Sequence, residues 1–142
     1  MSEFVIKQLS IFSENRYGRL FEIANALKEA NINLFAFSIA EAEGFGVIRA
    51  IVDDPEKAKE KLSSLGFVVS FTEILAIEMK DVPGGLAEAV LILKDARINI
   101  EYAYAYSGRE KAVLIIRVDN IEEAVERITE SGAKLVHNHH FT

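Results

Sequence analysis

The spacing of apolar residues predicts one amphipathic helix near the start of each half of the chain. Four apolar positions in each half recur at the i, i+3, i+4 and i+7 spacing that places side chains on one helix face. These positions are Leu20, Ile23, Ala24 and Leu27 in the first half, and Leu86, Ala89, Val90 and Leu93 in the second. Each stripe predicts a helix that packs one face on a sheet.

Two apolar runs rich in β-branched residues follow each of these helices. They cover residues 32–42 and 46–52 in the first half, and 98–106 and 112–118 in the second. A turn that contains glycine separates the two runs of each pair, which predicts a β-hairpin. A second helix is predicted after the first hairpin, because Asp53 and Asp54 are candidate N-caps and Pro55 suits the first helical turn.

The two halves of the chain are related by a shift of 66 residues without a gap. Gly18 aligns with Gly84 (84 − 18 = 66), and Gly66 aligns with Gly132, where both glycines mark the end of the second helix. The register also holds across the strands between these points. The repeat therefore predicts two copies of one fold.

Each copy reads as strand, helix, strand, strand, helix, strand. This βαββαβ order predicts an α+β protein made of two ferredoxin-like units in tandem, each with a four-stranded antiparallel sheet and both helices on one face. The predicted domains are residues 1–70 and 71–142. Residues 46–52 and 112–118 have apolar side chains at both parities, so both sheet faces should be covered, and a homodimer packed sheet on sheet is the expected cover.

Charge and composition exclude several classes of function. The 142 residues carry a formal net charge of -6, and the cations are interleaved with acids, which argues against a nucleic-acid partner. The absence of cysteine excludes disulfides and thiolate metal sites and favours an intracellular protein. Because no apolar run approaches the roughly 20 residues needed to cross a bilayer, we expect a soluble, cytoplasmic protein without a membrane partner.

The usual catalytic candidates are few. The three histidines, His137, His139 and His140, lie together near the end of the chain, and their spacing matches no metal-binding motif, so a frayed strand end is the favoured interpretation. Nucleophile, metalloprotease and phosphate-loop motifs are absent from the sequence. We therefore expect no enzymatic activity, no cofactor and no metal.

Glycines at the start of the first helix of each copy are a candidate binding feature. The first amides of a helix lack internal partners and lie at the positive end of the helix dipole, so they attract a carboxylate. Gly18, Gly84 and Gly85 would let a ligand approach this backbone, and Asn15 and Asp81 stand beside them. A helix cap with a permissive glycine explains the same pattern, and the residues alone leave both interpretations open.

Two further sets of residues have a structural and a functional interpretation. Asn33 and Asn99 lie just after the helix, where each carboxamide could serve the turn or a ligand. Tyr102, Tyr104 and Tyr106 alternate with alanines and should share one strand face. Core packing or a dimer interface is the first explanation of the tyrosines, and a lining for a ligand side chain is the second.

Taken together, the segments "ENRYGRL" and "DVPGGL", each followed by an amphipathic helix and then "NIN" or "RIN", resemble the ACT domain. The resemblance covers nearly the whole chain as two tandem copies and is greatest to small stand-alone tandem ACT proteins without a catalytic domain. Pro83 matches the proline of the family's turn. Tyr17 departs from it in the first copy and could place an aromatic ring beside the pocket.

The resemblance implies a regulatory module that binds a small effector, most often an amino acid, at the interface between two ACT units. By similarity to the serine-binding ACT domain of phosphoglycerate dehydrogenase, Asn15, Asn33 and Asn99 would be polar contacts, while Asp81 replaces the first Asn in the second copy and could make the two sites unequal. The full predicted set is Asn15, Arg16, Tyr17, Gly18, Arg19, Leu20, Asn33, Asp81, Pro83, Gly84, Gly85, Leu86 and Asn99.

Two functions of different class fit these expectations. The first is a non-enzymatic amino-acid sensor that acts on another protein, with a metabolic enzyme as a possible partner. The second is a scaffold or regulatory subunit that joins an enzyme through an apolar sheet face and binds no ligand.

Overall fold

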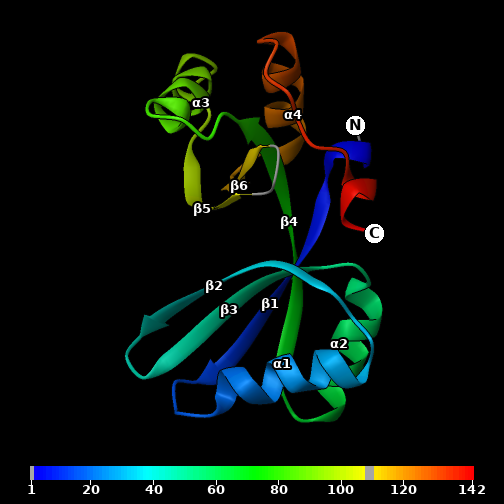
Figure 1. Ribbon diagram of the computed structural model, residues 1–142. Helices are drawn as coiled ribbons and strands as arrows, with labels where there is room; N and C mark the ends of the chain where they lie inside the picture. The colour runs from blue at the N-terminus through cyan, green and yellow to red at the C-terminus, as the bar shows by residue number, and fades with distance from the viewer. Residues whose placement is uncertain (1, 108–110) are drawn as a thin grey trace. The chain divides into compact units, whose positions relative to one another are not determined.

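The computed structural model describes residues 2–107 and 111–142, and the chain divides into two compact units (Figure 1). The first-repeat unit contains Lys7–Thr72 and Phe141–Thr142, and the second-repeat unit contains Met1–Ile6 and Glu73–His140. The division of the chain between residues 70 and 71 stays a prediction from the repeat.

Four strands and two helices build the first-repeat unit. They are β1 (Ile6–Glu14), α1 (Arg19–Glu29), β2 (Leu34–Ala42), β3 (Phe45–Val52), α2 (Pro55–Ser64) and the first part of β4 (Val68–Met79). β3 pairs antiparallel with both β1 and β2, and the strand order is β2-β3-β1-β4. Asp54 caps α2 as predicted, since its carboxylate accepts a hydrogen bond from the amide of Lys57 at 3.1 Å.

The core of this unit lies between the sheet and its two helices. Leu9 and Ile48 from the sheet are buried together with Leu62 of α2 and the inner residues of α1. The predicted stripe of α1 is partly wrong. Ile23 and Leu27 are buried as expected, but Ala26 completes the buried face, while Leu20 and Ala24 are exposed. The helix is therefore rotated relative to the predicted face, which leaves Leu20 at a surface.

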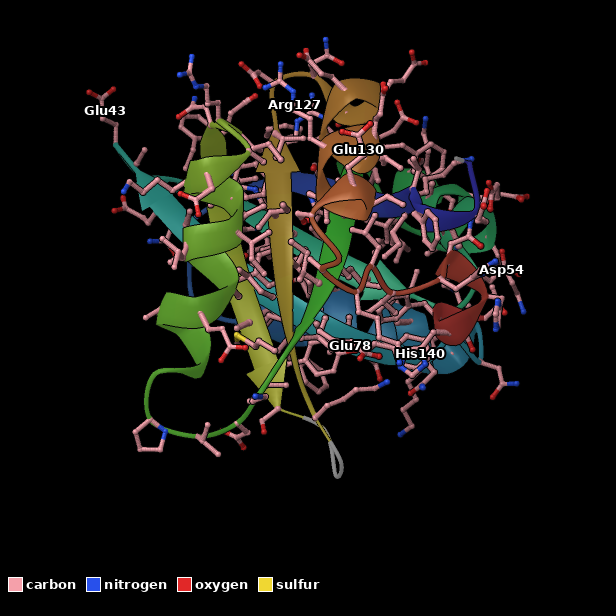
Figure 2. All side chains as sticks on the ribbon, turned by 90° about the horizontal axis from the view of Figure 1, so that it is seen from above. Glu43, Asp54, Glu78, Arg127, Glu130 and His140 are labelled. Carbon is pink, nitrogen blue, oxygen red and sulfur yellow. The ribbon has the colours of Figure 1, made fainter. Side chains whose placement is uncertain are left out.

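The second-repeat unit repeats this order as far as its second helix. Its main elements are the second part of β4, α3 (Gly85–Asp95), β5 (Ile100–Ser107), β6 (Ala112–Val118) and α4 (Ile121–Glu130), with short 3-10 helices η1 (Ser2–Phe4) and η2 (Asn138–Phe141). The sheet order is β4-β6-β5, and residues 108–110 of the turn predicted at 107–111 lie outside the described residues. Arg127 of α4, labelled in Figure 2, donates to the carbonyl of Ala96 at 3.0 Å and so ties α4 to the end of α3.

The prediction of two four-stranded sheets is wrong in detail. The pairing that would form the last strand is reduced to a bridge between Ile77 and Leu135, because only Leu135 and Val136 are apolar there and the chain then turns into η2. β4 is a single strand that supplies both repeats, and the strand order is β2-β3-β1-β4-β6-β5. The α+β class and the antiparallel pairing are confirmed.

The burial of residues along β5 and β6 agrees with the sequence. Tyr102, Tyr104 and Tyr106 are half-buried and share one face of β5, whereas the alanines between them are exposed. Burial raises the pKa of the Tyr106 phenol. β6 buries residues of both parities, as its unbroken apolar run predicted. The homodimer that we expected from this feature stays a prediction.

An ion pair in the first-repeat unit gives a testable pH dependence. Lys7 donates to the Glu56 carboxylate at 2.6 Å, and this hydrogen bond lowers the pKa of Glu56 below its ordinary value of 4.5. Since the folded-state pKa is the lower one, the stabilisation is present above pH 4.5 and is lost as pH falls through the folded-state pKa. Both side chains are about half exposed, so solvent limits the effect to less than about 1 kcal/mol.

We expect Glu56→Gln to lower the free energy of unfolding by this small amount at neutral pH and by less in acid. Urea unfolding of both proteins at pH 7 and at pH 3.5 measures the difference. If the difference in unfolding free energy between the two proteins is the same at both pH values, the ion pair is not the source of that difference.

Candidate functional site

A small pocket lies at the start of α1 in the first-repeat unit and contains most of the predicted residues of the first copy. Its volume is about 190 Å³. The lining residues are Ser13, Glu14, Asn15, Arg16, Tyr17, Gly18, Arg19, Leu20, Ile39, Gly46 and Ile48. The structure therefore places Asn15, Arg16, Tyr17, Gly18, Arg19 and Leu20 around one pocket, and their role in ligand binding stays a prediction.

The loop between β1 and α1 places helix amides at this pocket. Gly18 is the N-cap residue, has a left-handed φ of 92°, and makes no side-chain capping bond to α1. The loop is held by its backbone, since the Asn15 amide donates to the Gly44 carbonyl at 2.8 Å and the Arg19 amide donates to the Arg16 carbonyl at 3.3 Å. The first turn of α1, at Leu20, thus has amides without a side-chain cap beside the pocket.

Charged and apolar groups divide the pocket wall. Glu14 and Arg16 are the charged groups of the loop, and Leu20, Ile39 and Ile48 form an apolar side. Leu20 and Ile39 are 40% and 48% exposed, so they offer apolar surface that the unit's own core does not cover. The pocket can therefore receive a molecule that combines charged groups with an apolar part.

The Arg19 side chain packs on the core beside this pocket. Its guanidinium carbon lies 5.2 Å from the centre of the Phe67 ring, and its Nη1 donates to Glu22 at 2.8 Å. Arg19 Nε is buried without a hydrogen-bond partner among the described residues. The side chain thus packs on Phe67 and helps to fill the space beside α1.

The corresponding loop of the second repeat is arranged differently. Gly84 is again the N-cap in a left-handed conformation. The Asp81 carboxylate, however, accepts a hydrogen bond from the Ser107 hydroxyl at 2.7 Å. A Cβ built on Gly85 would lie only 1.9 Å from the Lys80 carbonyl oxygen, so this loop packs directly on the helix. Gly85 lines a different cavity, between α3 and residues 132–134.

Asn33 and Asn99 lie at the other end of α1 and α3, away from the helix starts. The Asn33 amide donates to the Asp53 carboxylate at 3.0 Å, and its carbonyl accepts from the Asp53 amide at 3.1 Å. The 11 residues of α1 rise by about 16 Å, so a single unit does not bring Asn33 to the pocket that contains Asn15. Asn15 and an asparagine of the Asn33 type could contact one ligand only if different ACT units supplied them.

The histidines pack around the last turn of the second-repeat unit. His137 makes an edge contact with Phe4 at 6.0 Å between ring centres, and His139 contacts His137. His140 lies in η2, so the expected strand end is wrong, because the chain forms a 3-10 turn there. Within residues 2–107 and 111–142, three metal-ligating side chains are nowhere grouped closely enough to hold an ion.

Sequence reasoning missed the residues that complete the pocket from the sheet. Ser13, Ile39, Gly46 and Ile48 come from β1, β2 and β3, and strand pairing places Ile48 opposite both Ile11 and Ile39. The apolar run of residues 34–40 predicts the strand β2, but it does not show which part of that strand stays uncovered. The missing information was the rotation of α1, which exposes Leu20.

Comparison with known proteins agrees with the class that this geometry defines: a pair of related α+β repeats, each with a glycine turn at the start of its first helix. The family described as ACT domain pair matches residues 4–142. The chain belongs to this family.

Solved structures share the fold over nearly the whole chain. A crystal structure of a protein from Bacteroides thetaiotaomicron has 39% identity and a TM-score of 0.89, covering 96% of this chain and 94% of that one. The ligand-free regulatory subunit of aspartate kinase from Thermus thermophilus has 15% identity and a TM-score of 0.67, covering 91% and 94%. The Thermus flavus subunit has 14% identity, a TM-score of 0.58, and coverage of 91% and 97%. These two subunits show a common fold alone.

The comparison with curated proteins found no match to this chain. Among the helices that the structure describes, none is both long and apolar enough to span a bilayer.

Proposed function

We propose that this protein is a non-enzymatic regulatory module that binds a small effector, an amino acid, at the start of α1 in the first repeat. The observation that carries the proposal is the pocket beside Gly18, where uncapped helix amides adjoin charged loop residues and an exposed apolar wall. Membership of the ACT domain pair family supports the same conclusion.

The chemistry of the pocket suits the three parts of an amino acid. A carboxylate would accept hydrogen bonds from the first amides of α1, where the helix dipole favours negative charge. An ammonium group would pair with Glu14 or with the Asn15 carboxamide, and an apolar side chain would contact Leu20 and Ile39. The pocket is smaller than the roughly 300 Å³ at which drug-sized sites begin, which favours a ligand of this size.

Two finer parts of the proposal come from the resemblance. A second ACT unit is expected to complete the site, and an asparagine of the Asn33 or Asn99 type would then reach the ligand from that unit. The structures of aspartate kinase regulatory subunits, which share the fold, suggest a metabolic enzyme as the protein that this module regulates.

A second candidate function is a scaffold subunit that binds an enzyme and no ligand. Exposed aromatic side chains of the first-repeat unit favour it, because Phe21, Phe37 and Phe45 all present apolar surface to solvent. Ligand binding separates this function from the sensor.

A thermal-shift screen of the full chain against the twenty amino acids, followed by calorimetry on each hit, tests the proposal. A ligand at about 100 times its Kd adds roughly 2.7 kcal/mol of stability and raises Tm by several degrees. If every amino acid leaves Tm unchanged, the sensor proposal fails and the scaffold function becomes the better one.

For a hit, we expect Asn15→Ala to weaken binding by up to about tenfold, the value of one lost hydrogen bond. Asn25→Ala is the matched control, because Asn25 lies on α1 and bonds Glu29 at 2.9 Å, outside the pocket. If Asn15→Ala weakens ligand binding no more than Asn25→Ala does, the ligand binds elsewhere.

A further inference from the structure

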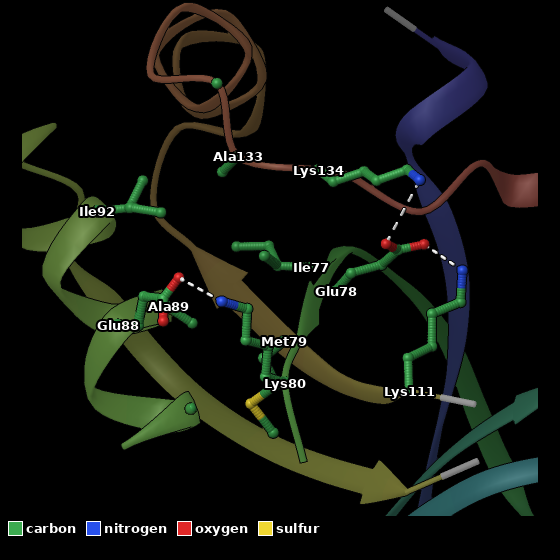
Figure 3. A pocket seen from close by; sticks show the side chains of 12 residues that line it. Ile77, Glu78, Met79, Lys80, Glu88, Ala89, Ile92, Lys111, Ala133 and Lys134 are labelled. Carbon is green, nitrogen blue, oxygen red and sulfur yellow. Dashed lines mark hydrogen bonds and ion pairs between the residues drawn. The ribbon is translucent and has the colours of Figure 1, made fainter. Parts of the chain in front are cut away.

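The second-repeat unit contains a larger cavity that the proposed function does not use. It has a volume of about 370 Å³ and lies between α3, the end of β4 and the segment that follows α4 (Figure 3). The lining residues are Ile77, Glu78, Met79, Lys80, Gly85, Glu88, Ala89, Ile92, Lys111, Gly132, Ala133 and Lys134.

The repeat shows why this space is open. In the first repeat, Arg19 stacks on Phe67, and Phe67 is only 8% exposed within the core. The shift of 66 residues (85 − 19 = 66, 133 − 67 = 66) places Gly85 at the position of Arg19 and Ala133 at the position of Phe67. A guanidinium and an aromatic ring that fill the first repeat are therefore absent from the second.

A third exchange enlarges the same region. Ala89 corresponds to Ile23, which is almost fully buried in the first repeat. The pairing after α4, which is reduced to one bridge, adds to the opening. The Glu78 amide donates a hydrogen bond to the Lys134 carbonyl at 3.0 Å, and the Val136 amide donates to the Ala76 carbonyl at 2.8 Å. After these two bonds the chain leaves β4. The floor and sides of the cavity are apolar and are formed by Ile77, Ala89, Ile92 and Ala133 (Figure 3).

The rim of the cavity carries charges that the first repeat lacks. Lys111 and Lys134 stand where the first repeat has Phe45 and Val68, and Lys80 stands where it has Glu14. The second repeat thus has three lysines at positions that hold none in the first. Such a change is not required by the fold, because the first repeat forms the same elements without it.

The lysines outnumber the acids that they pair with. Figure 3 shows Lys111 and Lys134 both directed towards Glu78, and Lys134 Nζ lies 3.7 Å from its carboxylate. Lys80 lies 3.8 Å from Glu88. Three cations and two anions leave the rim with one excess positive charge, on a chain whose formal net charge is -6. Local positive charge on an acidic protein favours a small anion at this place.

We propose that this cavity binds a small aliphatic carboxylate. Its hydrocarbon part would pack against Ile77, Ile92 and Ala133, and its carboxylate would take the lysine charge that Glu78 leaves unbalanced. The volume lies at the lower end of small-molecule sites, which suits a molecule of amino-acid size. The carboxylate can come from an amino acid, whose ammonium group would pair with Glu88, or from the corresponding keto acid.

The site is distinct from the pocket beside Gly18, because the two are built by different units and share no residue. It therefore does not depend on the proposed function of the first repeat. Substitutions in one pocket should leave binding in the other unchanged.

The test is calorimetry of the full chain with leucine, its α-keto acid and isovalerate, and with isovaleramide as the uncharged control. Ala133→Phe restores the ring that fills the first repeat and should weaken carboxylate binding at least tenfold. Ala87→Phe, which adds the same ring at an exposed position of α3, should leave it unchanged. Lys134→Val, which introduces the first-repeat residue, should weaken binding about fivefold, as expected for one exposed charge pair.

Each outcome decides the proposal. Binding of all three carboxylates, lost in Ala133→Phe, supports a site for which the carboxylate suffices. Binding of leucine alone with the same loss supports an amino-acid site. The proposal is overturned if none of the carboxylates binds at millimolar concentration, or if isovaleramide binds as well as isovalerate. The proposal is also overturned if a folded Ala133→Phe protein binds the carboxylates as tightly as the unmodified chain does. If binding is then lost only in Asn15→Ala, the ligand belongs to the pocket of the first repeat.

Discussion

Gly85→Ala is expected to destabilise the protein by about 1–3 kcal/mol or more, although alanine favours helices. A Cβ at this position would lie 1.9 Å from the Lys80 carbonyl oxygen, which is backbone and cannot rotate away. The loop from Lys80 to Gly84 would have to move off the start of α3. Urea unfolding measures the loss, and equal stability of the variant and the unmodified chain would show that the loop yields without cost.

Gly84→Ala is the matched control for this prediction. Gly84 has a φ of 87° and open space where a Cβ would lie, so alanine there meets strain but no collision. Left-handed backbone costs an alanine about 1–2 kcal/mol. We therefore expect Gly85→Ala to be the more harmful of the two, and also to change the Lys80 side of the carboxylate cavity.

Phe67→Ala is expected to lower the free energy of unfolding by about 3–5 kcal/mol, the usual range for a buried aromatic residue. The substitution removes a core ring and also the surface on which Arg19 packs, leaving a guanidinium beside a void. Unfolding by urea with an unchanged m-value would give the loss directly.

Leu65→Ala provides the comparison for Phe67→Ala, because Leu65 lies two residues earlier and is more than half exposed. Leu65→Ala should lower the free energy of unfolding by no more than about 0.5 kcal/mol. If the two substitutions cost the same, Phe67 does not hold the first repeat together, and the contrast between Phe67 and Ala133 loses its physical basis.

The sequence predicted the elements well where a periodic pattern was long. Both hairpins, the cap of α2 by Asp54 and the alternation of the tyrosines follow from local rules that tertiary structure did not override. It predicted the buried face of α1 less well. Ala24 and Ala26 are equally small and apolar, so the pattern alone could not decide which of them faces the core.

The last strand and the cavities needed the structure. Leu135 and Val136 look like the end of a strand, but only pairing with β4 shows that a single bridge forms. The sequence predicted only part of the pocket beside Gly18. Its loop is continuous in sequence, whereas its wall at Ile39 comes from a different strand. The cavity beside Ala133 depends on an empty volume, and a volume is fixed by packing rather than by any one residue.

β4 also has a consequence for how such a protein can evolve. Its 12 residues run without a break, the first part giving an edge strand to one repeat and the last part pairing with β6 in the other. A duplicated gene joined in this way is not easily divided again, since a cut within β4 leaves one product with an unpaired sheet edge. The two copies therefore stay in one chain, while each pocket is built from residues of its own unit and can change without the other.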